Sequence, residues 1–299
     1  YSFSQALFVP TPTFIIEPIK KVINNNVVSA LDSDSCEVIV MGRGVGFQAR
    51  PGMDIPPDRI QKIFKMDGKN SSDRLQELLK DIPMEHFQLC SDIIEYAKAK
   101  IGKKLNKNIY ITLTDHVNFA IERYRQGMNF SNPLLHEVKL FYKNEFAVGE
   151  YALSLINERV GALLPADEAA SIALHIVNAE YDSKIDEMTS VTRLISSILN
   201  IVEKYFNIQI DEQSLDFERF LTHLKFFAFR IFKHETIDVE DSGFRELIEQ
   251  QFAPEYRCSK KIAEFIEKRY RLHVQEEELY YLAVHIKRVT RKSPARGGG

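Results

Sequence analysis

The stretch LTDHVNFAIER, residues 113–123, is followed 107 residues later by FLTHLKFFAFR, residues 220–230. Aligned on their histidines, both stretches carry Phe three residues later and Arg seven residues later. A second matched pair comes after each, DEAASIALHIV at 167–177 and EELYYLAVHIK at 277–287. Self-similarity at a fixed period indicates duplicated structural units. The four matched histidines are His116 and His175 in the first copy and His223 and His285 in the second.

The duplicated part of the chain has the hydrophobic spacing of helices. Ser71 and Ser72 are expected to cap a first helix, and Pro165 suits the first position of another. Each copy, about 105 residues long, has the size of one domain. The remaining predicted helices are 84–101, 113–126, 133–142, 145–160, 166–181, 187–206, 214–233, 244–251, 255–270 and 276–291.

Residues 19–64 have a period of two instead, with Asn-rich and Gly-rich connections that favour hairpin turns. Four short strands bury little core, so we expect this unit to dimerise. The predicted strands are Lys20–Ile23, Val27–Leu31, Glu37–Met41 and Phe47–Arg50.

A chain of 299 residues is too long for one ordinary core. We predict a multidomain protein, in which a small antiparallel β domain precedes two homologous all-α helical bundles. Both ends are expected to be poorly ordered extensions or cloning remnants without function. The predicted divisions are an extension at 1–18, the β domain at 19–75, helical domains at 81–186 and 187–292, and a tail at 293–299.

The composition excludes several classes of protein. Lys and Arg number 39 against 42 Asp and Glu, so the chain is not basic overall, although a local nucleic-acid site stays possible. Cys36, Cys90 and Cys258 are too few and too far apart for a disulfide framework or a zinc site. No apolar run reaches the length that spans a bilayer. We expect a cytoplasmic protein that is not inserted in a membrane and needs no metal or cofactor.

The matched histidines allow more than one interpretation. A single histidine on an apolar helix is most often a packing residue, but four matched ones favour a shared role. The sequence lacks HExxH spacing and a nucleophile motif, which argues against metal binding and nucleophilic catalysis. Phosphorylation of a neutral ring nitrogen fits, and adds roughly two negative charges. The residues alone leave packing and phosphorylation open.

Charged neighbours accompany two of these histidines. Seven helical residues are two turns, about 10 Å, so Arg123 faces the same way as His116 without holding a phosphate there. We expect Arg123 and its counterpart Arg230 to support a neighbouring helix or a symmetry partner. Asp115 either fixes the ring of His116 or repels a phosphate, and Thr222 takes its place in the second copy.

The connections of the β unit contain residue types that bind nucleic acids. Asn side chains match base edges, Arg43 can meet phosphate or stack, and Phe47 offers a face for an unstacked base. The alternative is that the Asn run is merely a turn and Phe47 merely core.

Six motifs, taken in order, resemble those of the BglG/LicT family of bacterial transcriptional antiterminators. Their sequences look most like the β-glucoside branch of that family. The motifs are IKKVINNNVV, VMGRGVGFQ, LTDHVNFAIER, ALHIVNAE, LTHLKFFAFR and VHIKRV. The resemblance implies a co-antiterminator RNA-binding domain and two PTS-regulation domains, which pair in a homodimer. The dimer would bind an antiterminator hairpin in nascent mRNA and keep a terminator from forming. By the same resemblance, the RNA-binding residues are Lys21, Asn24, Asn26, Gly42, Arg43, Phe47 and Gln48.

The resemblance also implies control by the sugar phosphotransferase system. Its targets would be the four matched histidines, with a sugar-specific permease acting on the first domain and the phosphocarrier HPr on the second. The protein would therefore be a regulator and not an enzyme. Two alternatives remain: a DNA-binding activator, which would need a helix-turn-helix at the front, and a phosphorelay carrier that passes phosphate onward.

Overall fold

A computed structural model describes residues 16–65, 69–128, 130–183, 185–235 and 244–291. Most of the predicted extension and all of the predicted tail lie outside these residues. The chain divides into two compact units, the first formed by 1–131 and 144–182, the second by 132–143 and 183–299. Within the described ranges, no helix is long and apolar enough to cross a membrane.

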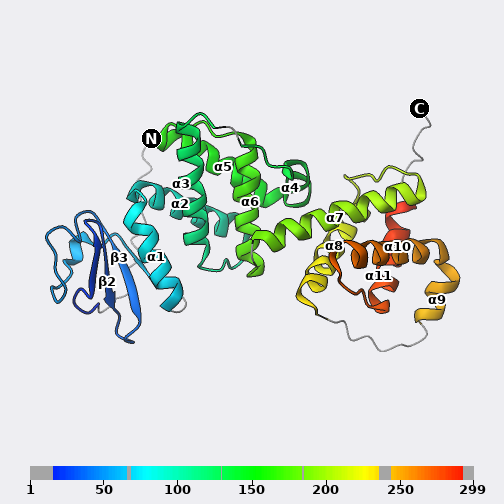
Figure 1. Ribbon diagram of the computed structural model, residues 1–299, viewed down its shortest axis with the longest axis horizontal. Helices are drawn as coiled ribbons and strands as arrows, with labels where there is room; N and C mark the ends of the chain where they lie inside the picture. The colour runs from blue at the N-terminus through cyan, green and yellow to red at the C-terminus, as the bar shows by residue number, and fades with distance from the viewer. Residues whose placement is uncertain (1–15, 66–68, 129, 184, 236–243, 292–299) are drawn as a thin grey trace, which may run out of the picture. The chain divides into compact units, whose positions relative to one another are not determined.

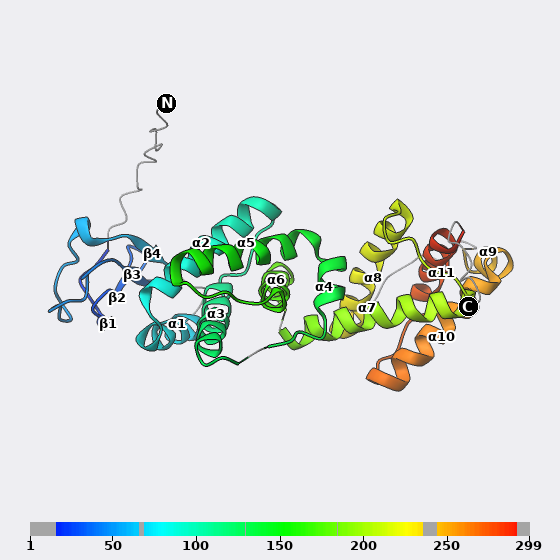
Figure 2. The same cartoon turned by 90° about the horizontal axis from the view of Figure 1, so that it is seen from above.

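The chain begins with an antiparallel sheet whose strands follow each other in sequence order (Figure 2). Three of the four predicted strands are confirmed, the first shifted by one residue. The fourth prediction is wrong, because residues 47–50 form no strand. Phe47 and Gln48 lie in a turn, in which Gln48 has a φ of 56°. The strands are β1 (Lys21–Asn24), β2 (Val27–Leu31), β3 (Glu37–Met41) and β4 (Lys62–Phe64).

Each face of this sheet has its own apolar cover. One face, which carries Val28 and Val40, packs against Ile19 and Val45 from the surrounding loops. The opposite face packs against helix α1 (Lys69–Asp81), which lies alongside the sheet in Figure 1. The core residues on that side are Val27, Ile39, Met41 and Phe64 of the strands and Leu75 and Leu79 of the helix. Residues of the same chain therefore pack against both faces of the sheet.

The first unit continues as a helical bundle. Helix α1 begins at Lys69, so Ser71 and Ser72 lie inside the helix and the predicted cap is wrong. Pro165 is the residue that precedes α6, one position earlier than predicted. The other helices are α2 (Met84–Ile101), α3 (Ile109–Arg125), α5 (Lys143–Val160) and α6 (Ala166–Tyr181).

In the described part of the second unit, every named element is a helix. Each of the ten helices predicted from 84 onward is confirmed, with ends that differ by up to four residues. In this unit α8 and α11 occupy the positions that the repeat assigns to α3 and α6. Its helices are α4 (Leu135–Phe141), α7 (Ile185–Phe206), α8 (Leu215–Lys233), α9 (Phe244–Gln251), α10 (Ala253–Tyr270) and α11 (Glu276–Thr290).

Candidate functional sites

Two asparagine side chains organise the loops beside β1. The Asn24 side chain accepts a hydrogen bond from the main-chain N–H of Asn26 at 2.8 Å and donates one to the carbonyl of Leu79 at 2.6 Å. Asn26 in turn accepts a hydrogen bond from the N–H of Gly44 at 2.8 Å. Both amides therefore hold the backbone in place, so the interpretation of the Asn run as a turn is correct in part.

The Gly-rich turn after β3 is tightly packed at its base. A Cβ at Gly42 would lie 1.7 Å from the carbonyl oxygen of Arg59, so only glycine fits there without movement of the backbone. The Arg59 guanidinium donates a hydrogen bond to the Gly44 carbonyl at 3.1 Å. The turn is thus anchored at its base and presents its tip outward.

The tip of this turn carries three exposed side chains, Arg43, Phe47 and Gln48. Phe47 is 57% exposed, so the interpretation of this ring as core is wrong. Nearby, the Lys21 ammonium donates to the Gln76 side chain of α1 at 3.2 Å. An aromatic face beside a guanidinium and an amide is an arrangement that can stack on and hydrogen-bond to an unpaired base.

The structure brings the four matched histidines together as two pairs, each inside one unit. The rings of His116 on α3 and His175 on α6 have centroids 4.7 Å apart. The rings of His223 on α8 and His285 on α11 are stacked at 4.2 Å. Residues that are far apart in sequence thus form the same constellation twice.

A carboxylate and an arginine brace each pair. Glu168 of α6 accepts a 2.6 Å hydrogen bond from Arg123 of α3, and its other oxygen lies 3.1 Å from Nε2 of His116. In the second unit, Arg230 donates to both carboxylate oxygens of Glu278, at 2.6 and 2.9 Å. The arginines therefore link neighbouring helices.

The two glutamates were missed as site residues by the sequence reasoning. Both lie seven residues before the second histidine of their copy, so the repeat contained a signal for them. Asp115, which the sequence placed beside His116, is exposed, and the carboxylate next to the ring is that of Glu168.

Burial sets the protonation of these rings. Burial lowers the pKa of His175 well below its usual value, and the nearby His116 adds to the effect. Burial, followed by the charges of His285 and Arg230, lowers the pKa of His223 to about 3. The pKa of His285 is also lowered, by burial and then by Arg288. Near pH 7 these three imidazoles are neutral, the form in which a ring nitrogen is a nucleophile.

Two ring nitrogens argue against simple packing. Nδ1 of His175 and Nε2 of His223 are buried and find no hydrogen-bond partner in the described part of the structure. A packing histidine normally satisfies both nitrogens, because an unpaired buried polar atom costs free energy. These rings are therefore better explained by a function that uses them.

Aromatic side chains at equivalent positions lie on the surface near each pair. Phe119 is 55% exposed and Phe226 53%, each three residues after the first histidine of its copy. No group of three His, Cys, Asp or Glu residues capable of holding a metal occurs among the described residues. The two exposed aromatic rings suit contacts with another protein.

Comparison with known proteins agrees with this arrangement. Residues 18–73 match the CAT RNA binding domain, and residues 91–179 and 196–289 match the PRD domain. The chain is 44% identical over 275 residues to the transcription antiterminator LicT of Bacillus subtilis (strain 168), covering 92% of this chain and 99% of LicT. It is 43% identical over 271 residues to the beta-glucoside operon antiterminator of Dickeya chrysanthemi, covering 91% and 96%.

Among solved structures, the crystal structure of GlcT CAT-PRDI is similar, at 33% identity and a TM-score of 0.49. That match covers 55% of this chain and 98% of the other. The near-complete coverage at 44% and 43% identity settles the relationship. The chain belongs to the BglG/LicT family of transcription antiterminators, which are RNA-binding regulators and not enzymes.

Proposed function

We propose that two copies of this chain act as an antiterminator in a sugar-utilisation operon, of the β-glucoside type. The dimer binds a hairpin in nascent mRNA and, by holding it, prevents the overlapping terminator from forming. The observation that carries this proposal is the exposed Arg43–Gln48 turn, which lies inside the segment that matches the CAT RNA binding domain.

Within this proposal the exposed and the buried residues of the turn have different roles. Arg43, Phe47 and Gln48 contact RNA, and unpaired bases of an internal loop are the natural target, because side chains cannot read an A-form stem. Asn24 and Asn26 offer their side-chain amides to the RNA at the base of the turn. Lys21 supplies a cation for the phosphate backbone, and Gly42 allows the close packing that shapes the surface.

Regulation operates through the histidine pairs. We assign phosphorylation to His116 and His175 in the first PRD domain and to His223 and His285 in the second. A sugar-specific permease acts on the first domain and the phosphocarrier HPr on the second. Added charge at paired domains biases two packings of the dimer, and thereby RNA binding. We expect the protein to act in the cytoplasm, where these partners and nascent mRNA occur.

We place the domain boundaries at 19–75, 81–186 and 187–292. In support of them, the family matches fall inside or within one residue of these ranges. The described residues before α1 form strands and one short 3-10 turn, Pro57–Arg59, rather than a helix-turn-helix. That arrangement disfavours a DNA-binding activator.

The test is binding of the full chain to a labelled antiterminator-type hairpin, against a fully paired hairpin of the same length. We expect preference for the looped RNA at two chains per hairpin. Arg43→Ala and Phe47→Ala should each weaken binding about tenfold or more, as expected for a lost base contact or stacking partner.

Arg50→Ala is the matched control, because Arg50 is an exposed arginine just outside the Arg43–Gln48 turn. It should weaken binding far less than Arg43→Ala. Equal affinity for the looped and the paired hairpin would refute the proposal, and so would an equal loss with Arg50→Ala.

A further inference from the structure

The two histidine pairs differ in the charges that surround them. Arg219 lies four residues before His223, and Arg288 lies three residues after His285. The corresponding residues of the first copy are Thr112 and Asn178, which are neutral. The duplication therefore kept the histidines but placed two cations beside only the second pair.

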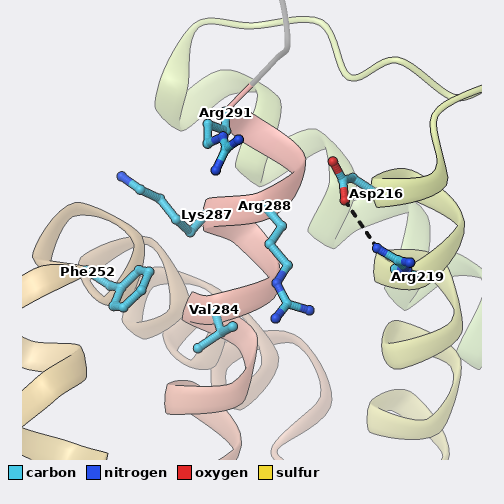
Figure 3. A pocket seen from close by; sticks show the side chains of 7 residues that line it. All are labelled: Asp216, Arg219, Phe252, Val284, Lys287, Arg288 and Arg291. Atoms are coloured by element: carbon cyan, nitrogen blue, oxygen red, sulfur yellow. Dashed lines mark ion pairs between the residues drawn. The ribbon is translucent and has the colours of Figure 1, made fainter.

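The structure brings these cations to the rings. A surface hollow of about 600 Å³ is lined by both histidines of the second pair together with Arg219 of α8 and Arg288 of α11. A neighbouring hollow of about 480 Å³ shares the two arginines. Figure 3 shows the Arg288 side chain reaching from α11 into the space that faces Arg219 on α8. Both guanidinium groups are thus presented where the histidine rings meet the surface.

The acidic groups around these hollows leave the cations largely uncompensated. Arg219 is 3.9 Å from Asp216, a loose contact, and Glu218 lines the larger hollow. Across the described residues, Arg288 has no ion-pair partner, and its charge contributes to the lowered pKa of His285.

Lys287 and Arg291 line the second hollow as well, and Lys287 is paired with Glu255 at 3.0 Å. Glu278, the counterpart of Glu168, accepts hydrogen bonds from two nitrogens of Arg230. Positive charge therefore predominates on the open side of the second pair.

We propose that Arg219 and Arg288 form an anion-binding clamp that holds a phosphoryl group carried on His223 or His285, and that the first pair lacks such a clamp. This inference rests on the proposed phosphorylation of the second pair. Guanidinium groups suit the task, because their forked donors match phosphate oxygens and keep their charge at any physiological pH.

The transfer itself balances without a further reagent. The lone pair of a neutral ring nitrogen forms the new N–P bond, while the bond between phosphorus and the donor atom breaks and leaves its electron pair on the donor. A proton passes from the other ring nitrogen of the acceptor to the donor side. The dianionic group then sits beside two cations instead of in water alone.

The first pair offers the opposite surroundings. The Glu168 carboxylate lies 3.1 Å from the His116 ring, and Arg123 is already bound to Glu168. A phosphoryl group there meets a like charge rather than a free guanidinium. The two helical domains, although alike in fold, thus stabilise a phosphoryl group on their histidines to different extents.

The test is the equilibrium of phosphoryl transfer between phosphorylated HPr and the full chain, read as occupancy of each histidine by mass spectrometry. We expect Arg219→Gln and Arg288→Gln each to shift the equilibrium of the second pair toward the donor by roughly tenfold, the worth of a charge-assisted hydrogen bond. Occupancy of His116 and His175 should not change.

Phosphorus NMR adds a readout that a merely structural role would not move. In the parent chain the cations should lower the second pKa of the phosphoryl group, and the double variant should restore it toward the value of free phosphohistidine. Arg219→Lys and Arg288→Lys keep the charge and should retain most of the effect. Arg257→Gln, which removes an exposed arginine of α10 that lines neither hollow, is the matched control.

The outcomes separate the two ideas. Phosphate on His223 or His285 that is insensitive to both Gln variants overturns the clamp and leaves the proposed regulation intact. No phosphate on either histidine of the parent chain overturns both. An equal shift with Arg257→Gln also overturns the clamp, because it would reflect net charge alone.

Discussion

The side-chain amide of Asn24 donates a 2.6 Å hydrogen bond to the main-chain carbonyl of Leu79, which joins the end of β1 to the last turn of α1. The same helix accepts a hydrogen bond from Lys21 through Gln76. Lys21 and Asn24, which we propose as RNA-binding residues, therefore both donate hydrogen bonds to α1. Under the proposed assignment, the helix and an RNA ligand would compete for these donors.

Releasing Lys21 from α1 should strengthen RNA binding. Gln76→Ala removes the partner of the ammonium, and because such a hydrogen bond is worth about 1 kcal/mol we expect affinity for the looped hairpin to rise up to roughly fivefold. Fluorescence anisotropy with the full chain measures it. Ser72→Ala, which removes the other partner of Gln76, is the control. Unchanged or weaker binding by Gln76→Ala would show that α1 does not compete.

Measurements of stability should distinguish a residue that holds the backbone, Asn26, from an exposed residue of the turn, Arg43. Asn26→Ala leaves the N–H of Gly44 without its acceptor, so the free energy of unfolding should fall by about 1 kcal/mol. Arg43→Ala removes an exposed side chain and should change stability by less than about 0.5 kcal/mol. Urea unfolding of both variants gives the comparison. A loss with Arg43→Ala as large as that with Asn26→Ala would contradict the assignment of Arg43 to the surface alone.

Periodicity and the internal repeat identified most of the fold and the four matched histidines, but not the contact between the rings of each copy. They failed where tertiary contacts decide: β4 has three residues and is defined by its pairing with β3, and α1 begins before the serines that resemble a cap. The covering of the sheet by α1 was equally invisible, because it depends on which apolar face meets which helix. Glu168 was visible in the repeat, but its place between His116 and Arg123 exists only in three dimensions.

The Glu–Arg braces should behave as coupled pairs. Glu168→Ala leaves the mostly buried Arg123 without its carboxylate, and losing one partner of such a pair costs about 3 kcal/mol. Arg123→Ala together with Glu168→Ala should cost less than the sum of the single changes. The same double-mutant cycle on Arg230 and Glu278 repeats the experiment in the second unit. Strict additivity in denaturant unfolding would mean that the braces contribute nothing as pairs.

The buried imidazoles make stability depend on pH in a predictable direction. Above about pH 6.5 an imidazole is neutral in both the folded and the unfolded chain, so its contribution is fully present there. Because the pKa of His223 is lowered to about 3 in the folded protein, only the unfolded chain takes up the proton as the pH falls below 6.5. The free energy of unfolding of the second unit should therefore fall by about 1.4 kcal/mol per pH unit for this histidine, a loss that continues until the pH approaches its folded pKa.

The window from pH 6.5 to 5.5 favours the histidines, because most carboxylates titrate below it. The exception is Glu180 of the first unit, whose pKa burial raises to about 7, and its contribution is common to the parent and the variant. Urea unfolding of the full chain across this window should give a shallower slope for His223→Gln than for the parent. His273→Gln, which removes an exposed imidazole of the same unit, is the control. The His285 ring, whose pKa is also lowered, should account for part of the slope that remains in His223→Gln. A parent slope preserved in His223→Gln would show that this ring is not held neutral by its burial.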